Sequence, residues 1–394
     1  MVPKGWEKNS LDSLFEFKNG LNTEKEQYGN GYKFVNVMDV FRNDILTESK
    51  IIGRVQVTDK QLEGYQLKYG DVLFNRTSET FDEIAIAAIY LDNAIATFGG
   101  FVIRARPKGN QIDPAYSVFL FQSKSYRSQV VKLGQGAIRA NIGQKDLARV
   151  CILVPPLAEQ KKIAQILSTW DKAISVTEKL LTNSQQQKKA QMQQLLTGKK
   201  RLLDERGGRY GGEWHRAELG AVLDYMQPTP YLVDSTDYND SYSIPVLTAG
   251  KSFILGYTNE EHGIYHAPLP AIIFDDFTTD SKFVDFEFKA KSSAMKILTA
   301  KKGVSAKYIF EAMQMLKFKI GGHQRHWISI YSNLVIPIPD AKEQQKIAAV
   351  LSAADAEIST LEKKLACLKD EKKALMQQLL TGKRRVKIDE AVAA

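Results

Sequence analysis

Residues 159–168, EQKKIAQILS, recur 184 positions later as EQQKIAAVLS at residues 343–352. The segment MQQLLTGK at residues 192–199 returns at the same offset, so neither copy has an insertion relative to the other. About 25 of the 43 positions are identical between residues 159–201 and 343–385, which is far more than chance would give. The chain therefore contains a long internal repeat whose two copies have equal length.

Both copies have the heptad pattern of a long helix. Apolar residues of the second copy follow alternating steps of four and three, and only Lys372 interrupts this seam. The first copy has a weaker seam, with Lys188 at the matching interruption. Gly198 and Gly382 stand where each helix would end. The pattern predicts two helices of about 38–40 residues, or roughly 55–60 Å, that pack on each other within one chain.

The segments before each helix have the texture of strands and share a skeleton. GDVLFNRT at residues 70–77 and PAIIFDDFT at residues 270–278 each predict a turn, a short buried strand and a polar loop. Near its end, each of the two regions before the long helices contains the motif Gly-x-x-Arg-x-x-Ile, at residues 136–142 and 322–328. The predicted fold class is α+β, with two globular domains of mixed α/β character. The long helices between them form an intramolecular antiparallel coiled coil in a pseudo-twofold arrangement.

The repeat also sets the predicted domain boundaries. They are a first globular domain at 1–155, a long spacer helix at 156–198, a linker at 199–213, a second globular domain at 214–339, a second spacer helix at 340–382, and a tail at 383–394. The linker is basic and rich in glycine, which suits an exposed connection. Like helices beside unlike domains indicate one kind of partner that is met twice, together with two different targets.

The composition indicates a protein of the cytoplasm with an anionic partner. Lys and Arg number 54 against 45 Asp and Glu, and the formal net charge of +9 favours a polyanion. Two distant cysteines, Cys151 and Cys367, make no disulfide framework, so a reducing compartment is expected. We find no apolar stretch of membrane-spanning length, and the N-terminus does not resemble a signal peptide.

The chain resembles the specificity subunits of Type I restriction-modification enzymes. The resemblance rests on Pro-Pro-Leu-x-Glu-Gln-x-x-Ile-Ala at residues 155–164 and its second copy at 339–348. It rests also on the Leu-Leu-Thr-Gly-Lys helix ends and on the Gly-Asp-Val-Leu strand at residues 70–73. These motifs extend over nearly the whole chain.

The resemblance implies two target recognition domains that bind an asymmetric, bipartite site on double-stranded DNA. It also implies that two DNA adenine methyltransferase subunits dock on the chain, and that endonuclease subunits with translocase activity then join. The chain itself would be non-catalytic and hold no cofactor, since the partner subunits bind S-adenosylmethionine, ATP and Mg²⁺. Such a complex would act on the nucleoid of a prokaryotic cell. The target sequence does not follow from the resemblance, because the recognition domains vary within the family.

Residues at strand ends are the candidates for DNA contacts. Lys and Arg neutralise phosphates, while Arg pairs with guanine, Asn or Gln with adenine, and Ser or Thr with either. The first domain offers Asn75, Arg76, Thr77, Ser78, Gln135, Arg139 and Asn141. The second domain offers Thr248, Lys251, Thr278, Thr279, His323, Gln324 and Arg325. Arg139 and Arg325 are the strongest candidates, because their loop recurs in both domains.

Two other functions fit part of the sequence. A metal-dependent nuclease would use Asp275 or Asp276 with Glu287 and Lys289, since cleavage of phosphodiesters needs clustered carboxylates. The period-two alternation of residues 285–289 favours a half-buried strand instead. A coiled-coil adaptor that binds no DNA is the other alternative.

The histidines do not predict a metal site. His262 and His266 lie four positions apart but lack an intervening Glu, and His323 and His326 flank an arginine. Histidine ligands need cooperating Cys or carboxylate side chains, so we expect no metal site at either pair.

Overall fold

The computed structural model describes residues 2–136, 139–248, 252–316 and 326–388. The predicted contacts at Lys251, His323, Gln324 and Arg325 therefore lie outside the described residues. By their internal contacts, the residues divide into two compact units, one of 1–177 with 364–394 and the other of 178–363. Each unit combines one globular domain with part of both long helices.

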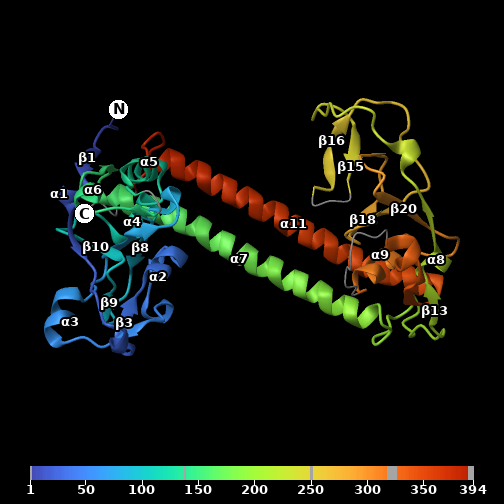
Figure 1. Cartoon of the computed structure of the whole chain (residues 1–394), viewed down its shortest axis with the longest axis horizontal. Helices are drawn as coiled ribbons and strands as arrows, with labels where there is room; N and C mark the ends of the chain where they lie inside the picture. Colours follow the sequence, from blue (N-terminus) through green and yellow to red (C-terminus); the bar gives the residue numbers. More distant parts are fainter. Residues whose placement is uncertain (1, 137–138, 249–251, 317–325, 389–394) are drawn as a thin grey trace. The chain divides into compact units, whose positions relative to one another are not determined.

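The two long helices match the heptad prediction. Helix α7 (Leu157–Leu195) and helix α11 (Ala341–Leu379) have 39 residues each, which corresponds to roughly 58 Å (Figure 1). Gly198 and Gly382 follow them with φ angles of +70° and +67°. This left-handed conformation is the usual end of a helix and favours glycine, so the predicted helix ends are confirmed.

The helices run antiparallel within each unit. In the first unit, Nζ of Lys372 near the end of α11 lies 2.5 Å from Oδ1 of Asp171 in the first half of α7. In the second unit, Nζ of Lys188 near the end of α7 lies 2.5 Å from Oδ1 of Asp355 in the first half of α11. The two lysines are the predicted interruptions of the seam. Each is therefore matched by an aspartate of the opposite helix, at equivalent positions of the repeat.

In the first unit, the start and the end of the globular domain meet. Strand β1 (Glu7–Ser10) pairs antiparallel with β12 (Cys151–Val154), directly before α7. The main sheet has the spatial order β2 (Phe15–Asn19), β10 (Val102–Pro107), β6 (Val72–Asn75), β8 (Ala87–Tyr90) and β4 (Ile45–Leu46). A smaller sheet has the order β5 (Arg54–Val55), β3 (Tyr28–Val35) and β9 (Ala96–Phe98), and β7 (Thr77–Ser78) pairs with β11 (Ala140–Asn141).

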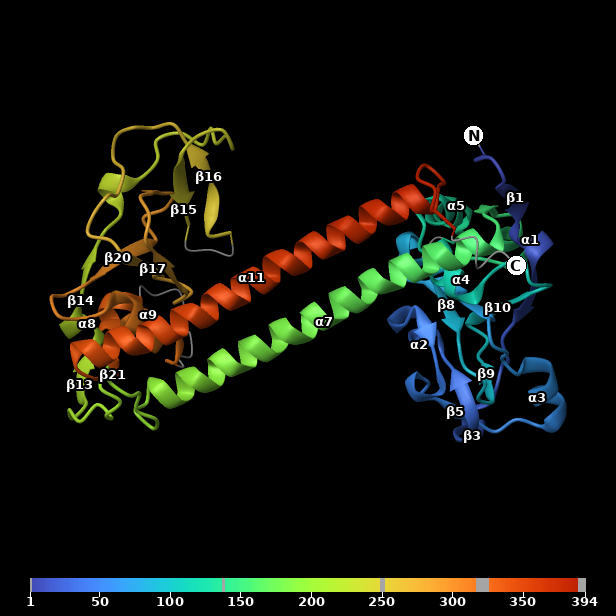
Figure 2. The same cartoon turned by 180° about the vertical axis from the view of Figure 1, so that it is seen from behind.

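Short helices surround these sheets, and one core joins them to the long helices. They are α1 (Leu11–Leu14), α2 (Val37–Arg42), α3 (Asp59–Tyr65), α4 (Pro114–Leu120), α5 (Lys124–Leu133) and α6 (Gln144–Ala148). Figure 2 shows α4 and α5 beside α7 and α11, and α3 with β3, β5 and β9 on the far side of the domain. Phe74 of β6, Ile163 of α7 and Leu379 of α11 belong to the same buried cluster. The beginning of α7 and the end of α11 are therefore part of the domain core.

The second unit is built in the same way. Strand β13 (His215–Glu218) pairs with β21 (Val335–Ile338) directly before α11. The main sheet has the order β14 (Leu223–Met226), β20 (Met295–Ala300), β17 (Ala271–Asp275) and β18 (Ser281–Val284), and the smaller sheet has β16 (Ile254–Thr258), β15 (Ile244–Leu247) and β19 (Lys289–Ala290). The short helices are α8 (Leu219–Val222), α9 (Ala306–Gln314) and α10 (His326–Ser329). The arrangement β14-β20-β17 repeats β2-β10-β6, which confirms the predicted common skeleton and the α+β class.

The Glu-Gln pair of the repeat is buried and fastens each helix to its domain. Glu159 accepts hydrogen bonds from Nε1 of Trp6 at 2.9 Å and from Nε and Nη2 of Arg385 at 2.7 and 2.8 Å. Glu343 makes the same contacts with Trp214, at 3.0 Å, and with Arg201, at 2.7 Å twice. This motif, which we call the carboxylate clasp, was not predicted from the sequence. The identity of these glutamates between the two copies thus has a cause inside the chain.

The neighbouring glutamines join the long helices to the short ones. Oε1 of Gln160 accepts a hydrogen bond from the backbone N of Asp113, the residue that caps α4. Oε1 of Gln344 accepts one from the backbone N of Ser305, which caps α9. Because both glutamines are buried, each hydrogen bond satisfies a polar group that would otherwise be costly. None of the described helices is long and apolar enough to cross a membrane.

Candidate nucleic-acid interface

The loop after β6 is shaped by one of its own candidate residues. The Asn75 side chain is buried, and its Nδ2 donates to the backbone O of Thr77 and of Glu83 at 3.2 and 2.9 Å. Its Oδ1 accepts from the backbone N of Ile86 at 2.5 Å. The amide of Asn75 is thus used up inside the domain. We predicted that it contacts DNA, but the structure places it as the anchor of the loop that carries Arg76 and Thr77.

A second segment, more than 60 positions further along the chain, meets this loop. Strand β11 pairs with β7, so that Asn141 lies opposite Thr77 and Ala140 opposite Ser78. The backbone N of Ile142 also donates to O of Arg76 at 3.0 Å. Gly136 has a φ angle of +124°, and a Cβ there would lie 2.1 Å from O of Arg139. This position therefore requires glycine. Candidates far apart in sequence are therefore brought together.

Some of these candidate side chains are exposed, and others are buried inside the domain. Arg76, Gln135, Arg139 and Asn141 are exposed, and Thr77 is half-buried. Ser78 is buried, and its Oγ accepts a hydrogen bond from the backbone N of Thr80 at 3.2 Å. Ser78 therefore supports the loop from inside, which departs from its predicted role as a DNA contact.

Helix α2 adds residues that the sequence analysis missed. A surface hollow of about 570 Å³ is lined by Thr77, Ser78, Glu79, Glu83 and Arg139 on one side, and by Val37, Met38 and Phe41 of α2 on the other. Met38 is 48% exposed, so this hollow has an apolar side. Apolar groups beside Arg and Thr suit a DNA groove, where they can contact the thymine methyl group. Only the short capping pattern of Asn36 and Asp39 signals this helix in the sequence.

The second unit has a corresponding turn between β17 and β18. Oδ1 of Asp275 accepts from the backbone N of Phe277 and of Thr278, at 2.8 and 3.1 Å. Thr278 is exposed, whereas Thr279 is half-buried, has a φ angle of +63° and is hydrogen-bonded to Tyr331. Burial raises the pKa of the Tyr331 hydroxyl, so this group stays protonated as a possible donor. Thr278 is thus the better placed of the two threonines.

This turn is tied to the segment that follows the recurring loop. The backbone O of Asp276 accepts from N of His326 at 3.0 Å, and its Oδ1 accepts from N of Trp327 at 2.9 Å. Asp276 is itself buried and paired with the buried Lys296 at 3.1 Å. In the first unit, the contact between Arg76 and Ile142 likewise joins the loop after the buried strand to the end of the recurring loop. Thr248, in contrast, follows β15 in the smaller sheet, where its backbone N donates to O of Phe253.

Comparison with known proteins identifies the family that has this architecture. The family described as "Type I restriction modification DNA specificity domain" matches residues 3–183 and 212–369, which include both domains and most of both helices. The chain belongs to this family. It is a Type I restriction-modification specificity subunit, as its sequence motifs indicated.

Individual relatives agree with this assignment. The chain is 26% identical to the putative type I restriction enzyme MjaX specificity subunit of Methanocaldococcus jannaschii, over 98% of this chain and 95% of that protein. It is 54% identical to the EcoR124I/EcoR124II specificity subunit of Escherichia coli over 145 residues, which span 36% of this chain and 35% of that protein. The crystal structure of an S subunit from M. genitalium has a similar fold, with a TM-score of 0.66 and 15% identity over 96% of both chains.

The nuclease alternative is not favoured, because the acidic and basic residues of this specificity subunit have separate partners. Asp276 pairs with Lys296, while Glu287 lies 2.8 Å from Nδ1 of His266. Lys289 is buried against Glu260 at 2.6 Å. Residues 285–289 also depart from the predicted alternating strand, since Lys289 is buried, Phe286 is partly exposed and only Lys289 belongs to a strand.

Asp234, Glu260 and His262 form the one cluster of three possible metal ligands among the described residues. Burial acts to raise the pKa of Glu260, but hydrogen bonds from Lys289 and from the backbone of Ser235 and Asp234 outweigh it and lower the pKa to about 2. The carboxylate is thus already neutralised by a buried lysine. In the specificity subunit this cluster closes a loop onto β19.

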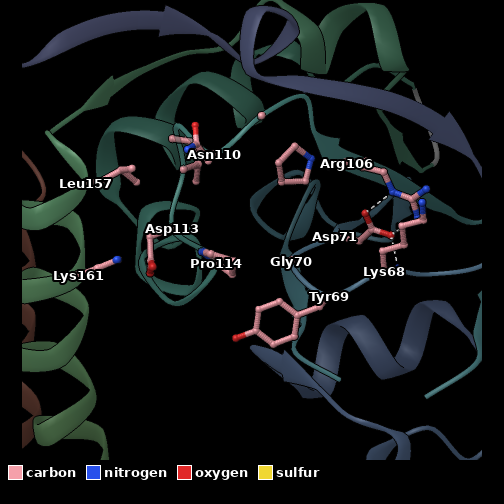
Figure 3. A pocket seen from close by; sticks show the side chains of 13 residues that line it. Lys68, Tyr69, Gly70, Asp71, Arg106, Asn110, Asp113, Pro114, Leu157 and Lys161 are labelled. Atoms are coloured by element: carbon pink, nitrogen blue, oxygen red, sulfur yellow. Dashed lines mark hydrogen bonds and ion pairs between the residues drawn. The ribbon is translucent and has the colours of Figure 1, made fainter. Parts of the chain in front are cut away.

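Another hollow lies beside the residues that directly precede β6 (Figure 3). It has a volume of about 530 Å³ and is lined in part by Lys68, Tyr69, Arg106 and Lys161. Asp71 in its wall is buried and held by two hydrogen bonds from Arg106, at 2.8 and 2.6 Å. Asp71 precedes β6 and Asn75 ends it, so the strand separates this hollow from the loop that carries Arg76.

Proposed function

We propose that the two domains of this specificity subunit bind the two halves of an asymmetric, bipartite site on double-stranded DNA. The observation that carries the proposal is the pairing of β7 with β11, which brings Thr77 and Arg139 to one surface hollow, with the exposed Arg76 directly before Thr77 in the chain. The second unit has the same skeleton but offers different side chains, such as Thr278. Like frames with unlike loops suit two different half-sites, because base contacts give specificity and phosphate contacts give position.

We propose in addition which partners this subunit binds, and that the partners carry out the catalysis. Two DNA adenine methyltransferase subunits would dock on the repeated helices, and endonuclease subunits would join through them. The partners would bind S-adenosylmethionine, ATP and Mg²⁺, and the specificity subunit would supply no catalytic residue. The complex would act in the cytoplasm on nucleoid DNA. Internal repetition supports this arrangement, since two equal partners need two equal surfaces.

Substitution of Arg139 tests the DNA-binding surface. Arg139→Ala should relax base preference in one half of the selected site and leave the other half unchanged, with a loss of discrimination of about 1–3 kcal/mol. The measurement is selection from a randomised DNA library by the complex with its methyltransferase subunits. Arg209→Ala, in the exposed linker, is the matched control. Unchanged preference in both halves of the site would remove Arg139 from the interface.

A further inference from the structure

An exposed aromatic ring lies beside the candidate DNA surface of the first unit. Phe101 belongs to the turn that joins β9 to β10, two strands that Figure 2 labels. Its side chain is 64% exposed, more than any other phenylalanine, tyrosine or tryptophan that the structure describes. It belongs to neither of the two buried clusters of this unit. The ring is therefore not used in the core of its own domain.

The backbone places Phe101 directly opposite Arg76. Strands β6 and β10 pair antiparallel, with Asn75 opposite Val102. One position further, N of Arg76 donates to O of Phe101 at 2.9 Å, so the same register continues beyond the strand ends. Opposite residues of an antiparallel pair project from one face, with Cβ atoms about 4.5–5.5 Å apart. The ring is thus a direct neighbour of an exposed arginine that we expect to contact DNA.

The turn that carries Phe101 is held by the backbone around it. N of Val102 donates to O of Gly99 at 2.9 Å, and N of Gly20 donates to O of Val102 at 3.0 Å. The two segments approach so closely that a Cβ added at Gly20 would overlap O of Gly99. Because the backbone is fixed before any partner binds, the ring is presented with little further loss of conformational freedom.

The second unit has the same backbone contact without the ring. N of Asp276 donates to O of Ala294 at 3.1 Å, directly before β20, as Arg76 donates to Phe101 directly before β10. Asp276 is buried, whereas Arg76 is exposed. At this position of the common skeleton, the first unit presents a cation and an aromatic ring, and the second unit presents neither.

An apolar planar ring beside an arginine matches the chemistry of unstacked bases. The faces of bases stack on aromatic side chains, while arginine binds the phosphates and the base edges next to them. Proteins that kink a duplex insert phenylalanine, leucine or methionine between adjacent base pairs. A contact with a thymine methyl group, in contrast, can be made by a side chain as small as alanine. The size, the exposure and the fixed backbone of Phe101 favour insertion.

We propose that Phe101 inserts between two adjacent base pairs of the half-site bound by the first unit and unstacks them. The inference rests on the proposed function and adds to it a residue that senses how easily the DNA is deformed. Sequence choice at that step then depends on stacking, because pyrimidine–purine steps unstack more easily than others. The second unit lacks the ring, so its half-site keeps regular stacking at the equivalent step.

Fluorescence of a base analogue in the complete complex tests the proposal. The chain is assembled with the methyltransferase subunits of its own system, and 2-aminopurine replaces one base at a time in the selected DNA. The adenines that become methylated are left out, since methyltransferases extrude their target base. The fluorescence of 2-aminopurine rises when it loses a stacked neighbour. We expect a rise at one step of one half-site in the parent complex, and its loss in Phe101→Ala.

A mismatch at the same step gives a second measurement that a simple surface contact would not change. A mispaired base costs less to unstack, so the parent complex should bind the mismatched site about fivefold more tightly than the matched site. Phe101→Ala should bind the matched site about tenfold more weakly than the parent and gain nothing from the mismatch. Phe101→Trp keeps a planar apolar ring and should retain the fluorescence rise and the affinity.

Tyr69→Ala is the matched control. Tyr69 is 56% exposed in the same domain, but it lines the other hollow, which lies beside the residues that precede β6. This variant should keep the fluorescence and the affinity of the parent. Phe101→Ala should keep the thermal unfolding temperature of the parent chain, because its ring belongs to no buried cluster.

The outcomes separate this proposal from the proposed function. If the parent complex selects a bipartite site but shows no fluorescence rise, or if Phe101→Ala retains the rise, insertion is wrong and the proposed function stands. If Phe101→Ala loses a methyltransferase subunit instead, the ring contacts the partner and the proposal is again wrong. If the parent complex selects no bipartite site, the proposed function fails and the proposal fails with it.

Discussion

Glu159 and Glu343 occupy equivalent buried positions in the two units, and each receives an indole N–H and both nitrogens of one arginine fork. The hydrogen bonds that Arg385 donates to Glu159 raise the pKa of its guanidinium, and those that Arg201 donates to Glu343 do the same for Arg201. These carboxylate clasps join three segments that are far apart in sequence. In the first unit they join the chain's beginning, the start of α7 and the tail after α11.

Neutralising the clasp should destabilise the protein. In Glu159→Gln the amide can still accept from Trp6, but Arg385 loses its counter-charge. Because Arg385 is partly exposed and can be hydrated, we expect a loss of about 2 kcal/mol in the free energy of unfolding, below the 3–5 kcal/mol of a fully buried pair. Denaturant titration gives the value, and Glu362→Gln on the exposed surface of α11 should change it by less than about 0.5 kcal/mol. Equal effects would contradict the structural role of the clasp.

Glu260 should make the stability of the second unit depend on pH in the acidic range. Its pKa in the folded chain is about 2, below the ordinary value of 4.5. A lowered pKa means that the contribution to stability is fully present above pH 4.5 and is lost as the pH falls towards 2. Between pH 6 and pH 3, the parent chain should therefore lose more unfolding free energy than Glu260→Gln. Parallel losses in both proteins would show that the Lys289 pair does not lower this pKa.

Single residues also show the limits of sequence-based prediction. Arg76 and Arg139 are exposed, as expected for loops that follow buried strands, and their contacts with DNA stay a prediction. Asn75 and Ser78 come from the same loop, but their side chains bind its backbone. A short polar side chain can either face solvent or support its own turn, and sequence alone does not separate the two. Met38 was missed because an exposed apolar residue on a short helix has no distinct pattern.

The long helices are the elements that the sequence predicts best. A heptad repeat and a terminal glycine depend on neighbouring residues alone, so the lengths and ends of α7 and α11 agree with the structure. The partners of the interrupting lysines were not predictable in the same way, since Asp171 and Asp355 lie on the opposite helix. The prediction of a half-buried strand at residues 285–289 was wrong, because Lys289 is buried beside Glu260, a residue that is distant in sequence.

The lysine and aspartate layers should fix how the two helices align. A charged pair within an apolar seam specifies register, since a shifted alignment would leave both charges without partners. Asp171→Lys places two lysines together and should destabilise the first unit, whereas adding Lys372→Asp should restore it. Because both groups are partly exposed, we expect a coupling energy of about 0.5–1 kcal/mol that falls with added salt. A double-mutant cycle measures this energy, and a value of zero would remove the layer as a determinant of register.

In the whole molecule, the two units share one arrangement of sheets and long helices but differ in their loops. The cores of both units include the ends of the long helices, so each domain is fixed to the helix pair by buried side chains. We expect the long helices to act in addition as a spacer between the two half-sites. A helix of roughly 55–60 Å has the length of about 16–17 base pairs of DNA, which sets the order of magnitude expected for the distance between the half-sites.

Selection of binding sites by a chain with longer helices tests this account most directly. Insertion of seven residues at matched points of both helices, after Lys179 and after Lys363, keeps the seam in phase and adds about 10.5 Å. We predict that DNA selected from a randomised library keeps both half-sites of the parent complex and gains about three base pairs between them. An unchanged gap, or altered bases in either half-site, would contradict the account.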